Sequence, residues 1–233
     1  MAWMIVSDSS CEIRELENPA PGVQFALVPF KIRVGEREYV DLATLNTQQM
    51  LQAMTDYNGA STTACPSPEE WAEYFLQADN VFAFTISSNL SGSYNAAQLA
   101  AEEYQQENPG KRVFVLDSLS TGPEQRLLAE HLRDLLAEGR EFDEVCEEML
   151  RYHKHTHLLF SLESLANLAR NGRVKPAVAA MARMLGIRVI GQASEAGELD
   201  VLCKTRGEHG ALERIVLELK EHGYTNGRLH ISH

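Results

Sequence analysis

The strongest constraint on the fold is the stretch of residues 81–97, VFAFTISSNLSGSYNAA. Its apolar start, Val81 to Ile86, is typical of a buried strand, and the hydroxyl-rich loop of residues 87–93 leads into a helix that we expect to begin near Tyr94. The first turn of a helix carries N–H groups without intrahelical partners and the positive end of the helix dipole. Gly92 lets a ligand approach the backbone closely. The stretch therefore predicts a site for an anion such as a carboxylate or a phosphate.

Ser and Asn residues before a helix are also the usual capping residues, and a cap requires no ligand. One such side chain is enough for a cap, whereas this loop supplies five: Ser87, Ser88, Asn89, Ser91 and Ser93. We therefore interpret the loop as a binding loop, in which Ser88, Ser91 and Gly92 are candidate ligand contacts.

Strand-like and helix-like segments alternate through the first two thirds of the chain. Apolar stretches predict strands at residues 4–8, 23–34, 81–86 and 112–116. Capping signals and periodicity predict helices at residues 47–57, 68–78, 94–107, 124–138 and 142–152. Parallel strands are joined by such crossover helices, which then cover the sheet. We therefore expect an α/β fold whose N-terminal part is a largely parallel sheet with helices on both faces.

The pattern changes after about residue 155. There we expect a strand at 158–160 and then two helices, one on either side of Asn171-Gly172. An antiparallel hairpin follows at 187–191 and 199–204, and then a helix at 207–222 and a last strand at 228–232. These elements predict two domains, an N-terminal α/β domain of residues 1–154 and a C-terminal mixed α/β domain of residues 155–233. Because the chain stops at His233 just after a strand begins, we expect the second domain to be incomplete at its C-terminal end.

Three further hydroxyl-rich segments follow a predicted strand or precede a predicted helix: residues 7–10, 61–67 and 117–122. The loops that follow parallel strands meet at one edge of the sheet, where ligands bind. Each segment is also explained by ordinary caps and turns. Because there are four such loops, counting residues 87–93, we favour a shared polar site at that edge.

Charge and composition narrow the class of partner. A formal net charge of −12 argues against nucleic acid or an anionic membrane as the main partner, because an acidic surface repels both. No apolar run approaches the ~20 residues of a membrane span, and the N-terminus lacks the features of a signal peptide. The four cysteines form no CxxC pair, so reduced thiols and a cytoplasmic location are the simplest interpretation.

Signals for catalysis or for a metal are weak. No GxSxG motif surrounds Ser91, and no acidic partner lies at ligand spacing from Asp8 or Asp117. His153, His155 and His157 alternate but have no thiol or carboxylate among them, so we expect no metal. Arg173, between two predicted helices, suits either an anionic headgroup or the carbonyls at a helix end, and these two roles remain equally open.

Several stretches together resemble the DegV family of bacterial fatty-acid-binding proteins. They are IVSDSSCEI (5–13), STTACPSPEEW (61–71), FTISSNLSGSYNAAQLAAEE (84–103), VFVLDSLSTGPE (113–124) and LESLANLARNGRVKPAVAAMARMLGIRVI (162–190). The resemblance covers nearly the whole chain in the family's order. It implies an N-terminal α/β domain and a C-terminal mixed domain, with a long-chain fatty acid such as palmitate buried between them.

The resemblance also implies a headgroup site. The carboxylate of the fatty acid would be held by Thr63 and Ser91, and a histidine like His233 often lies near the headgroup in the family. Where the family usually has Thr-Ser-Gln-Pro, this chain has Thr63-Ala64-Cys65-Pro66, which loses a hydroxyl and an amide. Relatives present the acyl carboxylate to a separate kinase, so the resemblance implies a non-enzymatic carrier without a cofactor. We expect a monomer, because no contiguous apolar surface stripe stands out in the sequence.

Two alternatives keep the anion site but make the protein an enzyme. An esterase or thioesterase with Ser91 as its nucleophile requires a base within hydrogen-bond reach, for which His230 and His233 are the candidates. A sugar-phosphate or glycerol-phosphate enzyme requires metal-binding carboxylates in the same loops, and no convincing set is present. The sequence favours the carrier.

Overall fold

A four-stranded parallel sheet forms one half of the molecule. The computed structural model describes residues 2–175, 178 and 186–232. The sheet has the order β2-β1-β6-β7, with β1 (Trp3–Asp8) and β6 (Asn80–Thr85) inside and β2 (Val23–Val28) and β7 (Arg112–Asp117) at the edges. Residues 4–8 of β1 and all of β6 are buried, as expected of parallel strands covered on both faces.

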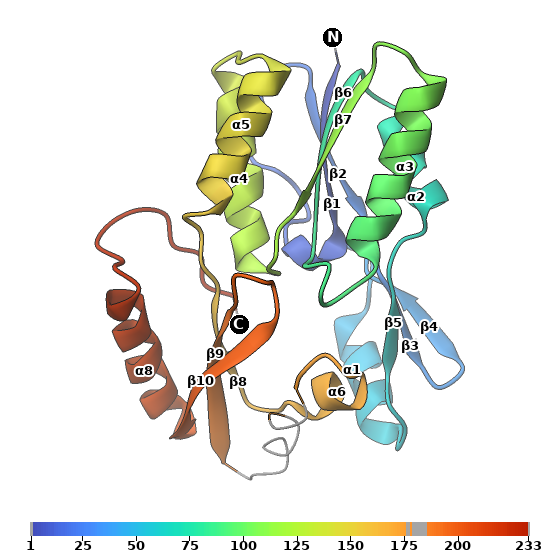
Figure 1. Cartoon of the computed structure of the whole chain (residues 1–233). Helices are drawn as coiled ribbons and strands as arrows, with labels where there is room; N and C mark the ends of the chain where they lie inside the picture. The colour runs from blue at the N-terminus through green and yellow to red at the C-terminus, as the bar shows by residue number, and fades with distance from the viewer. Residues whose placement is uncertain (1, 176–177, 179–185, 233) are drawn as a thin grey trace.

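Helices cover both faces of this sheet (Figure 1). One face carries α2 (Pro68–Phe75) and α3 (Ser93–Glu107), and the other carries α4 (Pro123–Ala137) and α5 (Phe142–His153). Side chains alternate along β1, so Met4 packs with Trp71 and Ala100 on the first face and Ile5 packs with Leu128 on the second. The predicted α/β class and helix-covered parallel sheet are confirmed.

A second, small sheet was not predicted. It has the order β4-β3-β5, is antiparallel, and consists of β3 (Lys31–Val34), β4 (Arg37–Val40) and β5 (Thr62–Ala64). The predicted single strand over residues 23–34 is wrong, because the chain leaves the parallel sheet at Pro29-Phe30. Proline has no N–H for a ladder, and the Phe30 N–H donates to Ser9 Oγ at 3.0 Å, in the short 3-10 helix η1 (Ser9–Cys11).

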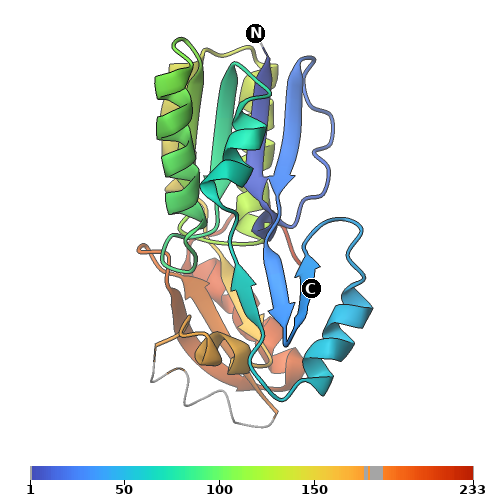
Figure 2. The same ribbon diagram turned by 90° about the vertical axis from the view of Figure 1, so that its right-hand side faces the viewer.

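Two helix starts next to this small sheet are predicted correctly from the sequence, that of α1 between β4 and β5 and that of α2 after β5. Asn46 caps α1 (Thr47–Asp56), and its side chain accepts from the Gln49 N–H at 3.0 Å. Ser67 caps α2 in a capping box with Glu70. Figures 1 and 2 show that α1 and β3–β5 lie below the parallel sheet, beside the C-terminal part of the chain.

The C-terminal part contains a third sheet, with the order β10-β9-β8. Its strands are β8 (Leu159–Leu162), β9 (Ile187–Ala193) and β10 (Leu199–Arg206), and α6 (Ala166–Arg170) and α8 (Gly207–Glu221) accompany them. The predicted hairpin is confirmed by the antiparallel pairing of β9 with β10. Most of the predicted helix after Gly172, and His233, lie outside the described residues. The boundary at residues 154 and 155 remains a prediction.

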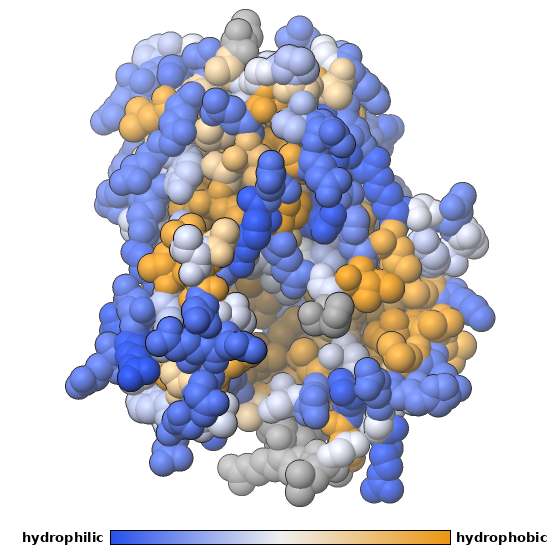
Figure 3. Space-filling view, turned by 180° about the vertical axis from the view of Figure 1, so that it is seen from behind, coloured by the Kyte–Doolittle hydropathy of each residue, from blue (hydrophilic) through white to orange (hydrophobic). Residues whose placement is uncertain are grey.

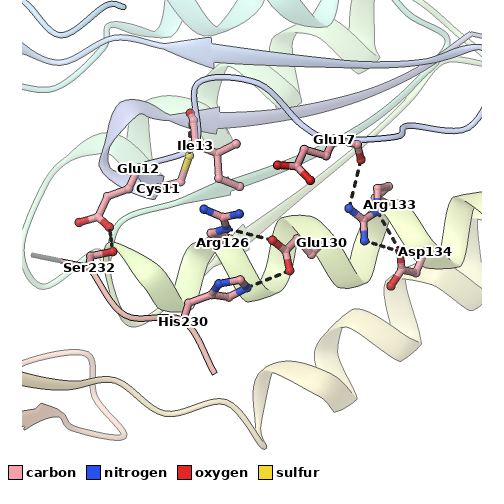
Figure 4. A network of polar contacts seen from close by, with 10 residues as sticks. All are labelled: Cys11, Glu12, Ile13, Glu17, Arg126, Glu130, Arg133, Asp134, His230 and Ser232. Atoms are coloured by element: carbon pink, nitrogen blue, oxygen red, sulfur yellow. Dashed lines mark hydrogen bonds and ion pairs between the residues drawn. The ribbon is translucent and has the colours of Figure 1, made fainter. Parts of the chain in front are cut away.

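The predicted strand at 228–232 is wrong, because this segment is irregular and lies along α4. Figure 4 shows His230 and Ser232 directed at two acidic side chains of the N-terminal half. His230 Nε2 donates to Glu130 Oε2 at 2.9 Å, the Ser232 hydroxyl donates to Glu12, and Arg228 forms an ion pair with Asp134. Polar side-chain contacts hold the segment where strand pairing was expected.

Several exposed hydrophobic side chains lie on α8 and the segment that follows it. Among them are Leu212, Val216 and Leu217 of α8 and Leu229 and Ile231 after it. Figure 3, seen from behind, shows hydrophobic side chains at the surface on the side of the molecule where α8 lies. This patch was not predicted from the sequence, and the monomer remains a prediction.

Candidate anion site at the carboxyl edge of the parallel sheet

Three parallel strands end at the same level. Ser7 of β1 pairs with Phe84 of β6, and Thr85 of β6 pairs with Asp117 of β7, so Asp8, Thr85 and Asp117 end their strands side by side. The loops of residues 87–93 and 117–122 and the segment of residues 7–10 therefore meet at this edge, as predicted.

Asp8 is the buried centre of the edge. Its carboxylate accepts from the Ile86 N–H at 2.9 Å, from the Ser93 hydroxyl at 2.7 Å, and from the N–H and hydroxyl of Ser10 at 3.3 and 2.5 Å. Burial raises the pKa of Asp8 above its ordinary value, although these hydrogen bonds act in the opposite direction. Asp8 thus holds both ends of the binding loop, because Ile86 directly precedes this loop and Ser93 is its last residue.

Asp117 holds the same loop near its start, at Ser88. Its carboxylate accepts from the Ser88 N–H at 3.2 Å and from the Leu119 N–H at 3.0 Å. Both aspartates are therefore occupied by backbone amides. Within residues 2–175, 178 and 186–232, no three His, Cys, Asp or Glu side chains are grouped so that they could hold a metal ion.

Ser87 takes part in most of the other hydrogen bonds that the backbone N–H groups of the loop form. Its N–H donates to Ser120 O at 2.8 Å, and its carbonyl accepts from the N–H groups of Leu90 and Ser91 at 2.9 and 3.1 Å. Its hydroxyl oxygen accepts from the Asn89 N–H at 3.2 Å. The side chain is fully buried, so Ser87 shapes the loop from inside and does not face solvent.

At the start of α3 lie backbone N–H groups that have no acceptor in this network. Among the described residues, no hydrogen bond uses the N–H groups of Gly92, Tyr94 or Asn95. Gly92 is exposed and Ser91 is half-buried, and the Ser91 hydroxyl oxygen accepts from the Ser93 N–H at 3.3 Å. The Ser91 hydroxyl can therefore still donate. Together with the helix dipole, these groups are suited to a carboxylate or a phosphate.

The segment of residues 61–67 reaches the same place from the small sheet. The Cys65 sulfur lies 3.4 Å from the position that a Cβ on Gly92 would take. Thr63 stands two residues earlier, in β5, where it pairs with Ile32 and is exposed. Thr63 is thus on a strand and not in a loop as predicted, two residues before the cysteine that lies beside Gly92 of the binding loop.

The structure connects Arg173 to the anion site less directly than it connects Cys65. The Asn171 side-chain amide donates to Ser61 O at 2.9 Å and so joins the end of α6 to the start of β5. Arg173 is exposed, and its guanidinium donates to Asn171 O at 3.3 Å. The structure therefore brings its loop to the segment of residues 61–67.

The contact between the turn of the predicted β9–β10 hairpin and the binding loop was not predicted from the sequence. The Ser87 hydroxyl donates to Gly197 O at 2.7 Å, and the Asn89 side-chain amide donates to Ala196 O. Ser87 and Gly197 are 110 residues apart in the sequence, and Asn89 and Ala196 are 107 residues apart. A glycine in a hairpin turn is expected for local reasons alone, so no local signal distinguishes this one.

The histidines do not complete a catalytic site in the described part of the chain. His230 is occupied by Glu130 on α4, and His153 Nε2 donates to Ser118 O at 2.7 Å. No histidine of the described ranges forms a hydrogen bond to the Ser91 hydroxyl. Within the described ranges, the Ser91 hydroxyl therefore has no histidine as the adjacent base that a serine nucleophile requires, and His233 lies outside them.

Comparison with known families identifies the chain. A family model described as uncharacterised proteins of the DegV family matches residues 2–233. The chain belongs to the DegV family. It is similar to a DegV domain-containing protein of Streptococcus pneumoniae (strain ATCC BAA-255 / R6), with 41% identity over 229 residues that cover 98% of this chain and 82% of the relative. A DegV domain-containing protein of Streptococcus gordonii is also 41% identical, over 100% of this chain and 83% of the relative.

Solved structures of DegV proteins have the same fold. The Streptococcus pneumoniae Fatty Acid Kinase (Fak) B3 protein, loaded with linoleic acid, superposes with a TM-score of 0.94 at 41% identity, over 96% of this chain and 80% of that one. A DegV family protein from Eubacterium eligens, loaded with heptadecanoic acid, has a TM-score of 0.90 at 40% identity, over 96% of this chain and 79% of that one.

The space between the two halves of this DegV chain is hollowed. Figure 3 shows a depression at the centre of the rear face, with hydrophobic atoms lying deeper than the polar side chains around it. No helix in the described part of the chain is long and apolar enough to span a bilayer.

Proposed function

We propose that this DegV chain binds a long-chain fatty acid between its two halves and acts as a carrier, presenting the carboxylate to a separate kinase. The observation that carries the proposal is the set of unpartnered amides at Gly92, Tyr94 and Asn95 beside the half-buried Ser91. It is supported by similar DegV proteins that were crystallised with linoleic and heptadecanoic acids.

The headgroup end of the proposed site combines two chain segments. Ser91 donates its hydroxyl, the amides of the first turn of α3 add to it, and Thr63 on β5 completes the cradle from the other side. Ser88 and Gly92 keep the loop close to the carboxylate, and Arg173 supplies a positive charge near the rim. His233, outside the described residues, is a further proposed contact. An ionised carboxylate is favoured here because charged hydrogen bonds are roughly twice as strong as neutral ones.

The acyl tail is proposed to fill the apolar space below the parallel sheet. In the described residues, the C-terminal half has a small buried hydrophobic cluster of Leu165, Val178 and Val189, compared with the larger clusters beside the parallel sheet. A fatty-acid tail adds apolar surface to such a cluster. Each buried methylene contributes about 0.8 kcal/mol, so the tail provides most of the affinity and the headgroup provides selectivity.

The proposed role is that of a binding protein and not of an enzyme. The partner kinase would phosphorylate the fatty acid that this chain presents. This follows from the similarity to a fatty acid kinase B3 protein. All four cysteines are free thiols, which suits action in the reducing cytoplasm.

Native mass spectrometry of the freshly purified protein, followed by lipid extraction, tests the proposal. We expect a mass excess that resolves into free fatty acid. The delipidated protein should then bind palmitate more tightly than 1-hexadecanol, which has the same chain length but no carboxylate. A protein that is empty on purification and takes up neither ligand would overturn the proposed function.

A further inference from the structure

The tip of the β9–β10 hairpin reaches across to the binding loop of the other half. Figure 1 shows it directly beneath the carboxyl edge of the parallel sheet. The turn is held internally: Ser194 N–H donates to Glu198 O at 2.9 Å, Gly197 N–H donates to Ser194 O at 2.8 Å, and Glu198 N–H donates to Ser194 Oγ at 3.1 Å. A turn constrained in this way presents the Gly197 carbonyl in one fixed position.

That carbonyl is connected to the anion site through one residue. It accepts from the Ser87 hydroxyl at 2.7 Å, and the carbonyl of Ser87 in turn accepts from the N–H groups of Leu90 and Ser91. The hydroxyl that donates to Gly197 also accepts from the Asn89 N–H at 3.2 Å. Hydrogen bonds of Ser87 therefore link the hairpin turn to the backbone that presents Ser91.

Gly197 fits this contact because it lacks a side chain. It is buried, and its φ of +75° lies in the left-handed region. A Cβ added there would stand 2.2 Å from Ser87 Oγ and 2.9 Å from Leu119 Cα. Any larger residue must separate the turn from the loops that follow β6 and β7.

We propose that Gly197 and Ser87 are positioning residues, through which the C-terminal half sets the geometry of the anion-binding loop and so its preference for a carboxylate. This inference rests on the proposed function, because the preference concerns the headgroup of a fatty acid. It gives the C-terminal half a role in headgroup recognition in addition to enclosing the tail.

The test compares Gly197→Ala with Gly207→Ala. Gly207 also has a left-handed φ, of +74°, but nothing lies within 4 Å of its added Cβ, so this control introduces similar backbone strain without the steric overlap. For each protein, affinity is measured for palmitate and for 1-hexadecanol. We expect Gly197→Ala to lower the palmitate-to-hexadecanol preference about tenfold or more, and Gly207→Ala to leave it unchanged. Ser87→Ala, which removes the connecting hydroxyl without adding bulk, should shift the preference in the same direction.

A loss of affinity that is equal for both ligands would show a general structural effect and would overturn the positioning role. Hydrogen exchange in the ligand-free protein provides a second readout that does not depend on the ligand. We expect faster exchange over residues 87–91 in Gly197→Ala and not in Gly207→Ala, and equal exchange in both variants would also overturn the inference. Failure of the wild type to bind palmitate, with this exchange pattern present, would refute the proposed function alone.

Discussion

The Ser93 hydroxyl, on the first residue of α3, donates a 2.7 Å hydrogen bond to the Asp8 carboxylate at the end of β1. A carboxylate buried at a helix start is stabilised by the helix dipole. Here the buried carboxylate accepts from the Ser93 hydroxyl and from none of the N–H groups of Gly92, Tyr94 and Asn95. Asp8 therefore fixes the start of α3 while leaving the exposed amides to a ligand.

Asp8→Asn should change how stability depends on pH. Burial raises the pKa of Asp8 above 3.8, so the unfolded chain releases this proton at a lower pH than the folded protein does. The contribution of Asp8 to stability is present below its unfolded pKa and is lost as pH rises through its folded pKa. We therefore expect the stability of Asp8→Asn relative to wild type to increase over that window. Urea unfolding between pH 3.5 and about 7 measures this difference. A difference independent of pH would contradict it.

Thr63→Ala and Ser91→Ala should each weaken fatty-acid binding. Loss of a hydrogen bond to an ionised headgroup costs about 1–3 kcal/mol, which isothermal titration with palmitate can resolve. Thr62→Ala is the matched control, because adjacent strand residues point to opposite sides and Thr62 is also exposed. If the double variant binds as tightly as wild type, the headgroup lies elsewhere.

Alkylation of Cys65 should block the proposed site. Its sulfur lies beside Gly92, whereas burial raises the pKa of Cys11 to about 11 and that of Cys146 to about 12, which makes both poor nucleophiles. We expect N-ethylmaleimide to label Cys65 before these two, and bound palmitate to slow that labelling. Labelled protein should lose palmitate binding, and Cys65→Ser should retain binding after the same treatment. Peptide mass spectrometry locates the label. Equal labelling rates with and without palmitate would place Cys65 outside the site.

The parallel half of the fold is predictable because its signals are local. The apolar residues 81–86 and the capping box at Ser67 each depend on a few neighbouring residues, and both predictions agree with the structure. The small sheet has no such signal, because Thr62–Ala64 is short and exposed. Residues 228–232 have the composition of a strand, but whether a strand forms depends on a partner, and here the segment contacts α4.

The candidate site likewise has one part that the local sequence predicts and another part that it does not. The binding loop follows from its own sequence, whereas the contact between Ser87 and Gly197 joins residues 110 apart and leaves no trace in either segment. Asp8 was considered in the sequence as a metal ligand, for which no acidic partner was found, because spacing alone does not tell whether a carboxylate faces a metal ion or a backbone amide.

Glu70→Gln should show the opposite pH dependence from Asp8→Asn. Glu70 accepts from Lys31 Nζ at 2.7 Å and from the Ser67 N–H at 2.9 Å, and these bonds, that of Lys31 first, hold its pKa below 4.5. Its contribution to stability is therefore present above its unfolded pKa and is lost as pH falls through its folded pKa. Glutamine retains a capping-box acceptor but carries no charge, so the variant should be less stable than wild type at pH 7 and equally stable at the acid end. When Lys31 is first replaced by Met, the Glu70→Gln substitution should lose most of its effect on urea unfolding, because Lys31 is the main cause of the pKa shift. A variant that is equally destabilised at pH 3.5 and pH 7 would show that the charge of Glu70 has no part in joining β3 to α2.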